Sequence, residues 1–390
     1  MASFSSFSYQ ATLLTLAIFF ASYASTSSSS STTVNASRAT QAGHFTKIFA
    51  FGDSYTDTGN TKSDTGPNGF MHVSKPPYGM TFFHQPTNRY SDGRLVIDFV
   101  AEALSLPYLP PYLNLKANKV HGVNFAVAGA TAINHSFFVR NNLTLNRTPQ
   151  SILTELAWFK KFFNSQVCRG TKLRNCKALM SDSLFWIGEI GANDIAYNLG
   201  STVSNALIQK LTMDSVTLFL QELLDMGAKY IVVQGAPPTG CLPLALTLAA
   251  PDDRDEIGCV ASANNQSYHH NSLLQVRLKY LRRRYPHAII SYADYWNAYQ
   301  TIMKNTHKYG FTKPFMACCG TGGPPLNFDI FSTCGSQAAS IACPNPAKFI
   351  NWDGVHLTEG MYKVVADLLL RGGYMHPPFN FLLSSRSRGV

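Results

Sequence analysis

The sequence of 390 residues lacks a run of about eighteen apolar residues, the length that a helix needs to cross a bilayer. Its uncharged apolar segment near the N-terminus, residues 11–20, is too short for that purpose. Internal repeats and a recognisable linker are absent as well. We therefore expect a chain without stable membrane insertion, whose main part folds as one domain.

Metal-site and nucleic-acid patterns are also missing. No Cys-x-x-Cys pair and no cluster of histidine and cysteine has the spacing of a zinc site, so we expect no metal and no cofactor. The densest basic cluster, residues 282–284, lacks the aromatic interleaving of a nucleic-acid surface and ends a long predicted helix. Cations at the C-terminal end of a helix offset the helix dipole, which explains this cluster without a nucleic acid. We therefore expect no nucleic-acid partner.

Acidic residues are few. The sequence has 22 Asp and Glu against 32 Lys and Arg, which gives a formal net charge of +10. A basic protein attracts anionic partners, such as acidic small molecules or an acidic cell wall. Arg89 and Arg94 lie in the stretch RYSDGR and are candidates for binding an acidic group, although this stretch is also expected to cap a helix.

The first residues have features of a secretory signal peptide. The apolar segment 11–20 is followed by Ser22 and Ala24, small residues at the spacing that signal peptidase accepts, although a basic first region is missing. We interpret residues 1–24 as the signal peptide, residues 25–45 as a disordered Ser/Thr-rich spacer and residues 46–385 as a single domain. A buried apolar N-terminal helix is the alternative.

Sequons and cysteines agree with passage through the secretory pathway, to the extracellular space or the vacuole. The eight cysteines suggest disulfides, and although about 105 pairings are possible, Cys168 with Cys176 is a plausible local pair. Acceptor sequons for N-glycans occur at Asn35, Asn134, Asn142, Asn146 and Asn265, and the proline at position 149 weakens the fourth.

Apolar runs alternate with amphipathic stretches along almost the whole chain, which is the pattern of a parallel sheet with helices on both faces. We expect an α/β fold, a three-layer α/β/α sandwich with a mainly parallel five-stranded sheet. The predicted strands span residues 47–51, 123–127, 183–188, 230–235 and 288–293.

The helical pattern is clearest between these strands. A helix over residues 91–106 is expected to have Ser91 or Asp92 as its N-cap. In the helix predicted over residues 263–286, His269 and His270 are expected on an exposed face. Other helices are predicted over residues 148–163 and 207–227 and near the end of the chain.

Three candidate site residues follow directly on predicted strands. Ser54, Gly129 and Asn193 come after the first, second and third strand. Because ligands bind beyond the carboxyl ends of the strands in an open parallel sheet, we expect them to gather at one edge. Taken singly, each has a plainer explanation: Gly-Asp-Ser is an ordinary turn, Gly129 makes a turn, and Asn193 caps a helix.

The chemistry of these residues fits acyl transfer. A serine hydroxyl needs a base that removes its proton, and the base needs a partner that fixes its tautomer. Asp353 and His356 lie three residues apart in a predicted turn and suit these roles, unless Asp353 merely caps the last helix and His356 is a surface residue. The backbone N–H of Gly129 and the amide of Asn193 are candidate donors to the oxyanion of a tetrahedral intermediate.

Four segments in this order, FGDSYTDTGN, VNFAVAGA, GANDI and DGVHLT, resemble the conserved blocks of the plant GDSL esterase/lipase family within the SGNH hydrolase superfamily. The resemblance extends from residue 47 to about residue 372. It implies a flavodoxin-like three-layer fold, with Ser54 as nucleophile and Asp353 with His356 as the charge-relay pair. The oxyanion donors that it implies are Gly129, Asn193 and the backbone N–H of Ser54.

The sequence departs from the family pattern at two positions. Tyr55 stands where the motif's name has leucine, and Ala128 precedes Gly129 where the family often has a second glycine. Neither residue supplies a side chain to the expected chemistry. These departures therefore affect the prediction of which substrate shape the site accepts, not the prediction of its chemistry. A Gly-x-Ser-x-Gly motif is missing, which argues against the α/β-hydrolase fold.

We therefore expect a serine enzyme that transfers the acyl group of small plant esters to water. The first alternative is an acyltransferase that moves a hydroxycinnamoyl group, for example from chlorogenate to a hydroxylated acid acceptor such as glucarate. The second alternative is a non-catalytic secreted glycoprotein. The presence of all five site residues together argues against it.

Overall fold

The computed structural model describes residues 45–62, 72–146, 148–170 and 173–387. All of these residues belong to one compact unit. The predicted signal peptide, nearly all of the predicted spacer and the sequon at Asn35 lie outside the described residues. Within the described part, no helix is both long enough and apolar enough to span a membrane.

A six-stranded sheet lies at the centre of the molecule. Its strands are β1 (Ile48–Phe51), β2 (Gly122–Asn124), β3 (Leu184–Ile187), β4 (Tyr230–Gln234), β5 (Ile289–Ala293) and β8 (Met375–His376). Five of them are parallel in the order β2-β1-β3-β4-β5, the order of flavodoxin-like folds. The predicted fold class and all five predicted strands are confirmed. The prediction of only five strands is wrong, because β8 extends the sheet antiparallel to β5.

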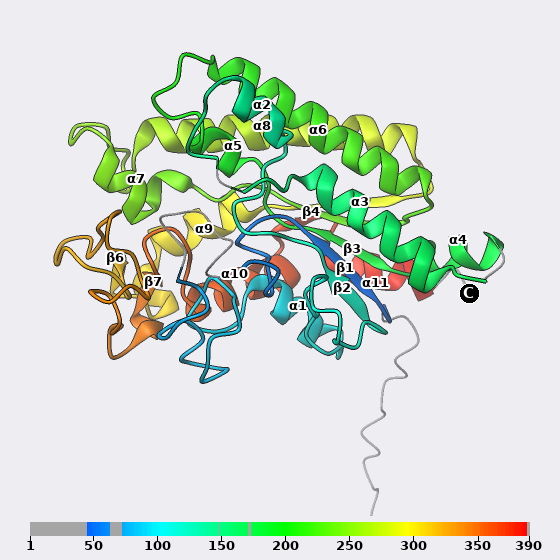
Figure 1. Ribbon diagram of the computed structural model, residues 1–390, viewed down its shortest axis with the longest axis horizontal. Coiled ribbons are helices and arrows are strands. Elements are labelled where there is room, and N and C mark those ends of the chain that lie inside the picture. Colours follow the sequence, from blue (N-terminus) through cyan, green and yellow to red (C-terminus); the bar gives the residue numbers. More distant parts are fainter. Residues whose placement is uncertain (1–44, 63–71, 147, 171–172, 388–390) are drawn as a thin grey trace, which may run out of the picture. The chain divides into compact units, whose positions relative to one another are not determined.

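Helices cover both faces of this sheet (Figure 1). The helices that pack on its two faces are α1 (Val96–Ala103), α3 (Ile152–Phe162), α6 (Asn205–Asp225), α8 (Ala261–Arg284), α9 (Tyr295–Lys304) and α10 (Glu359–Arg371). Phe49 and Phe51 of β1 pack with α3, α6 and α8, whereas Ile48 and Ala50 pack with α1, α9 and α10. Burial on both faces explains why the strands are continuous apolar runs.

Short elements complete the fold. They are α2 (His135–Arg140), α4 (Leu173–Ser181), α5 (Ala192–Ala196), α7 (Pro243–Leu248) and α11 (Phe379–Ser387), with single helical turns η2 (Phe163–Val167), η3 (Thr239–Cys241), η4 (Thr306–Tyr309) and η5 (Pro346–Lys348). Outside the central sheet, β6 (Lys313–Ala317) and β7 (Phe349–Asn351) form a separate parallel pair that the sequence does not predict.

Four disulfides link all eight cysteines. The bridges are Cys168–Cys176, Cys241–Cys259, Cys318–Cys343 and Cys319–Cys334. The first is the local pair expected from the sequence. The last two begin at neighbouring residues after β6, so the loop closed by Cys319–Cys334 lies inside the loop closed by Cys318–Cys343.

The N-cap predicted for α1 is wrong. The helix begins at Val96, and the Asp98 carboxylate in its first turn accepts a hydrogen bond from the backbone N–H of Leu95 at 2.9 Å. Asp92 instead meets the first turn of another helix, α10, because its carboxylate accepts from the backbone N–H of Glu359 at 2.7 Å. The local sequence could not show this partner, which is 267 residues away.

The expectation for the two neighbouring histidines of α8 is half wrong. His269 is exposed, but His270 is only 2% exposed and faces the interior. Burial lowers the pKa of His270 to about 4, so the ring is neutral in ordinary buffers.

Candidate active site

Ser54 lies in a tight turn at the carboxyl end of β1. The Asp53 carboxylate accepts a hydrogen bond from the backbone N–H of Tyr55 at 3.0 Å. The Asp53 carbonyl accepts from the N–H groups of Thr56 and Asp57 at 3.0 and 2.9 Å. These bonds reverse the chain immediately after the strand and leave Ser54 8% exposed.

Asp57 links this turn to the segment that contains Gly129. Its carboxylate accepts hydrogen bonds from three N–H groups of its own loop at 2.6 to 3.0 Å, and from the N–H of Ala128 at 3.0 Å. Gly129 follows with a φ of +77°, a conformation that glycine adopts without strain. The loop of Ser54 and the backbone at Gly129 are thus fixed to each other.

Asp353 and His356 form a buried pair in the turn after β7. The Asp353 carboxylate lies 2.7 Å from Nδ1 of His356 and accepts from the backbone N–H groups of Val355 and His356 at 3.0 and 2.8 Å. The two side chains are 0% and 3% exposed. The cap of α10 is Thr358, whose hydroxyl accepts from the N–H of Met361, so the capping explanation for Asp353 does not apply.

The surroundings of Asp353 favour its charged form. Burial alone would raise the pKa of this carboxyl, but the charge of His356 and hydrogen bonds from His356 and Tyr78 outweigh burial and lower the pKa. An ionised Asp353 keeps the proton of His356 on Nδ1. Nε2 is then the ring nitrogen that can accept a proton.

Tyr55 joins the turn of Ser54 to the turn of His356. Its hydroxyl donates to the carbonyl of Val355 at 2.7 Å, and its ring centre lies 5.8 Å from that of His356. Tyr55 is only 6% exposed. The residue in the place of the motif's leucine is therefore buried beside the histidine and hydrogen-bonded to the turn that carries it.

Asn193, which follows β3, is hydrogen-bonded to the segments that contain Ser54 and Gly129. Its amide nitrogen donates to the Asp53 carboxylate at 2.9 Å and to the carbonyl of Ala130 at 3.0 Å. These two acceptors are the neighbours of Ser54 and Gly129 in the sequence. Helix α5 begins at Ala192 with Gly191 as its N-cap, so Asn193 lies inside the helix and does not cap it.

A second buried acidic group lies at the base of this site. Asp53 and Glu189 are each about 1–2% exposed, and Glu189 accepts from the backbone N–H of Ala192 at 2.9 Å. Burial, followed by the charge and hydrogen bond of Glu189, raises the pKa of Asp53 well above its usual range. Burial also raises the pKa of Glu189. The sequence gives no signal for this pairing, since Glu189 lies 136 positions after Asp53.

The two arginines considered for an acidic ligand are paired within the fold. Arg89 is buried and bonded to Asp98 at 2.8 Å through two nitrogens. Arg94 is paired with Glu102 at 2.7 Å and with Glu359 at 2.6 Å. Their charges are neutralised by carboxylates, so these residues give no support to an anionic substrate.

Three of the four described sequon asparagines, Asn134, Asn142 and Asn265, are exposed. Asn146 differs, because it is 6% exposed and its amide oxygen contacts the ring nitrogen of His135. The amide nitrogen of Asn146, which would carry a glycan, is buried. A glycan at this position would require the side chain to turn outward.

One hollow of about 420 Å³ lies between α6 and α8, and another of about 320 Å³ lies between the start of α8 and α9. Neither is lined by Ser54, Asp353 or His356. Among the described residues, no three His, Cys, Asp or Glu side chains are grouped closely enough to bind a metal ion.

Comparison with known proteins agrees with the resemblance seen in the sequence. The model of the GDSL-like lipase/acylhydrolase family matches residues 48–369. A GDSL esterase/lipase of Arabidopsis thaliana is 60% identical over 346 residues, which is 87% of this chain and 89% of the relative. A sinapine esterase of Brassica napus is 39% identical over 355 residues, which is 89% of this chain and 90% of the relative.

Among solved structures, a catalytic mutant of the acetylxylan esterase Axe2 from Geobacillus stearothermophilus aligns with 13% identity and a TM-score of 0.38. The alignment covers 84% of this chain and 94% of the bacterial one. A likeness this weak supports no inference about function.

Proposed function

The chain belongs to the GDSL-like lipase/acylhydrolase family and is a serine ester hydrolase, and we propose that its nucleophile is Ser54. The proposed substrates are carboxylic esters of small plant metabolites, and the acyl acceptor is water. The observation that carries the proposal is the buried Asp353–His356 pair at 2.7 Å, connected through Tyr55 to the turn of Ser54.

In the first half of the reaction, the Ser54 hydroxyl oxygen bonds to the ester carbonyl carbon while Nε2 of His356 takes the hydroxyl proton. Asp353 stabilises the imidazolium that forms. The tetrahedral intermediate then expels the alcohol, which takes the proton from His356, and the acyl group stays on Ser54. In the second half, His356 takes a proton from water while the water oxygen bonds to the acyl carbon. The second tetrahedral intermediate then breaks its bond to the Ser54 oxygen, which takes that proton back from His356 as the acid leaves.

The oxyanion of each intermediate would be bound by the backbone N–H groups of Ser54 and Gly129 and by the amide of Asn193. Both hydrogens of that amide already have acceptors, so one of them has to be exchanged. The Asp53 carboxyl is the easier one to replace. Its pKa is raised, first by burial and then by Glu189, and a protonated carboxyl is a weaker acceptor than a carboxylate.

Esters of hydroxycinnamic acids are the first substrates to test, because one of the relatives is named a sinapine esterase. The net charge of +10 favours anionic esters such as chlorogenate over cationic choline esters such as sinapine. Each of the two is compared with the neutral methyl ester of its own acid, methyl caffeate for chlorogenate and methyl sinapate for sinapine, which separates the effect of charge from that of the acyl group. If each charged ester is turned over at the same rate as its methyl ester, charge selection is excluded.

Active-site labelling and product analysis test the proposal directly. We expect a fluorophosphonate probe to label the wild type but not Ser54→Ala, and free acid to accumulate whether or not glucarate is added. A new ester that forms at the expense of free acid would instead identify an acyltransferase. Absence of labelling in a well-folded wild-type protein would contradict Ser54 as nucleophile.

We also propose that the chain enters the secretory pathway and loses residues 1–24, in agreement with its four disulfides. Glycans are expected on the exposed Asn134, Asn142 and Asn265 rather than on the buried Asn146. Mass spectrometry of the mature N-terminus and of the glycopeptides checks both statements. A fully occupied Asn146 would show that the chain is glycosylated before this region folds.

A further inference from the structure

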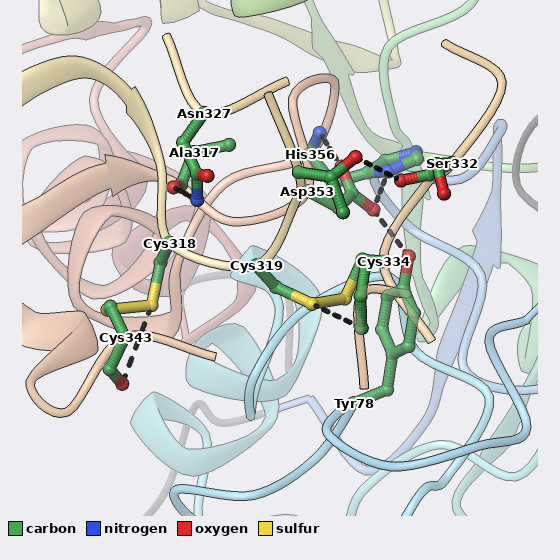
Figure 2. The surroundings of a disulfide bond; sticks show 12 residues. Tyr78, Ala317, Cys318, Cys319, Asn327, Ser332, Cys334, Cys343, Asp353 and His356 are labelled. Atoms are coloured by element: carbon green, nitrogen blue, oxygen red, sulfur yellow. Dashed lines mark hydrogen bonds and ion pairs between the residues drawn. A yellow bond between two sulfur atoms is a disulfide. The ribbon is translucent and has the colours of Figure 1, made fainter. Parts of the chain in front are cut away.

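We propose that Tyr78 is a positioning residue of the reaction, which orients the carboxylate of Asp353 through a side-chain hydrogen bond. This inference rests on the proposed roles of Ser54, Asp353 and His356. The Tyr78 hydroxyl donates to the Asp353 carboxylate oxygen Oδ2 at 2.8 Å, and the same oxygen lies 2.7 Å from Nδ1 of His356 (Figure 2).

The two oxygens of Asp353 have separate partners. Oδ1 accepts from the backbone N–H groups of Val355 and His356 in its own turn. Oδ2 is bound by two side chains, His356 and Tyr78. The hydrogen bond from the phenol therefore restrains the rotation of the Asp353 carboxylate about its Cβ–Cγ bond. This rotation determines the direction from which Oδ2 approaches the imidazole. A carboxylate without this donor has one fewer constraint on that rotation.

Tyr78 itself is fixed by its surroundings. It is 1% exposed, and its ring lies edge-on to Trp352 at 5.9 Å and to Tyr90 at 6.0 Å. The next residue, Gly79, has a φ of +75°, and a Cβ there would lie 2.1 Å from the carbonyl oxygen of Gln85. The turn that presents Tyr78 thus requires glycine at position 79.

The paired disulfides support the same group of side chains. Tyr78, Tyr90 and Trp352 share one apolar cluster with Cys319 and Cys334. Figure 2 shows the Cys319–Cys334 bridge beside the ring of Tyr78, with the hydroxyl of Tyr78 directed at Asp353. The backbone N–H of Cys319 also donates to the carbonyl of Trp352 at 2.7 Å. The bridge therefore packs in the same cluster as the ring of Tyr78. Through Cys319 it is also hydrogen-bonded to Trp352, the residue before Asp353.

The chemistry of the contact suits a donor that stays protonated. Burial and the charge of Asp353 raise the pKa of Tyr78 well above its usual value, so its hydroxyl keeps its proton throughout the working range of an esterase. Several titratable groups face Asp353. They are His356 in its own turn, Tyr78 and Tyr90 from the segment before α1, and Tyr362 from α10.

The test is Tyr78→Phe, which removes only the hydroxyl. We expect kcat to fall about tenfold with KM changed less than about twofold, because a hydrogen bond to a charged group is lost while substrate contacts remain. The midpoint of the acid limb of kcat/KM should rise by roughly half a pH unit. Without the hydrogen bond from the phenol, the negative charge of Asp353 is less stabilised. It therefore holds a proton on the Asp353–His356 pair more strongly.

Tyr299→Phe is the matched control. Tyr299 is also fully buried, and its hydroxyl has no hydrogen-bond partner among the described residues. Its variant should keep kcat and the acid limb unchanged. Rates are expressed per site titrated with the fluorophosphonate probe, so that partly unfolded protein does not count as lost turnover.

Three outcomes would overturn the role of Tyr78. They are an unchanged kcat and acid limb in Tyr78→Phe, a loss shared equally by Tyr299→Phe, and a rise in KM without a change in the acid limb. Ser54→Ala and Asp353→Asn are measured in parallel. If these two variants keep full activity, the proposed function fails as well; if they are inactive and Tyr78→Phe is normal, only the inference about Tyr78 fails.

Discussion

Two buried carboxyl groups flank the candidate nucleophile, and they have opposite electrostatic surroundings. Asp353 and Asp53 are 0% and 2% exposed, so burial penalises the charge of both. Asp353 faces an imidazole, a phenol and two backbone N–H groups, and its pKa is lowered. Asp53 faces Glu189, and its pKa is raised well above the usual range.

The comparison shows that burial does not decide the charge of a carboxyl group; its partners do. A cation and several donors can outweigh desolvation, whereas a second carboxyl adds to it. The lowered pKa of Asp353 favours a carboxylate beside His356, whereas the raised pKa of Asp53 favours a neutral carboxyl that accepts from the amide of Asn193. The following experiments test this difference, from the largest expected effect to the smallest.

Asp353→Asn should have the largest effect, a loss of about 10³- to 10⁴-fold in kcat. The asparagine has nearly the same shape, but it cannot stabilise the imidazolium of His356. Steady-state kinetics per titrated site measure the loss, and circular dichroism controls for folding. A loss below tenfold would mean that this carboxylate is not the partner of the base.

Asn193→Ala should lower kcat by about 10²- to 10³-fold, the range for loss of one oxyanion donor. Labelling by the fluorophosphonate should slow as well, because that reaction also builds negative charge on oxygen. Asn193→Asp provides a second comparison, since its charge would repel the oxyanion. If Asn193→Ala is as active as the wild type, the amide serves only to link Asp53 to the carbonyl of Ala130.

Asp53→Asn applies the substitution made at Asp353 to the carboxyl whose pKa is raised, and its effect should be much smaller. We expect a loss of about tenfold or less, because the asparagine resembles a protonated aspartate and gives up only one acceptor for Asn193. The ratio of the two Asp→Asn effects is the informative quantity. Similar losses in the two variants would contradict a neutral Asp53.

Glu189→Gln should have the smallest effect, and it concerns stability rather than rate. Carboxyls whose pKa is raised in the folded state stabilise it below about pH 4, and this contribution is lost as the pH rises through the raised values. The wild type should therefore lose stability between acid and neutral pH, and the variant should lose about 1 kcal/mol less. Urea titrations at pH 5 and pH 8 measure the difference, and an identical pH dependence in both proteins would exclude the pairing.

The sequence predicts those features that depend on short segments. The five parallel strands, the long helices and the positions of Ser54, Gly129 and Asn193 at strand ends follow from apolar runs and the residues that end them. Asp353 and His356 are also close in sequence, so a single turn could be expected to pair them. Their roles in catalysis remain predictions until the variants are measured.

The features that the sequence does not predict depend on distant contacts. Tyr78 meets Asp353 across 275 positions, and Asp92 accepts a hydrogen bond from the first residue of a helix 267 positions away. Strand β8 has only two residues, too few to form a pattern. His269 and His270 are adjacent in sequence, and only the packing of α8 decides that the second faces inward.

The arrangement of one disulfide loop inside another also affects what happens when a protease cleaves the chain in this region. Phe331 and Ile341 are 95% and 84% exposed, and both lie within the loop closed by Cys318–Cys343. A cut after Phe331 also falls within the inner loop, so both bridges still join the two fragments. His356 would remain covalently attached to the piece that carries Ser54. An enzyme nicked at this loop would migrate as one chain until it is reduced.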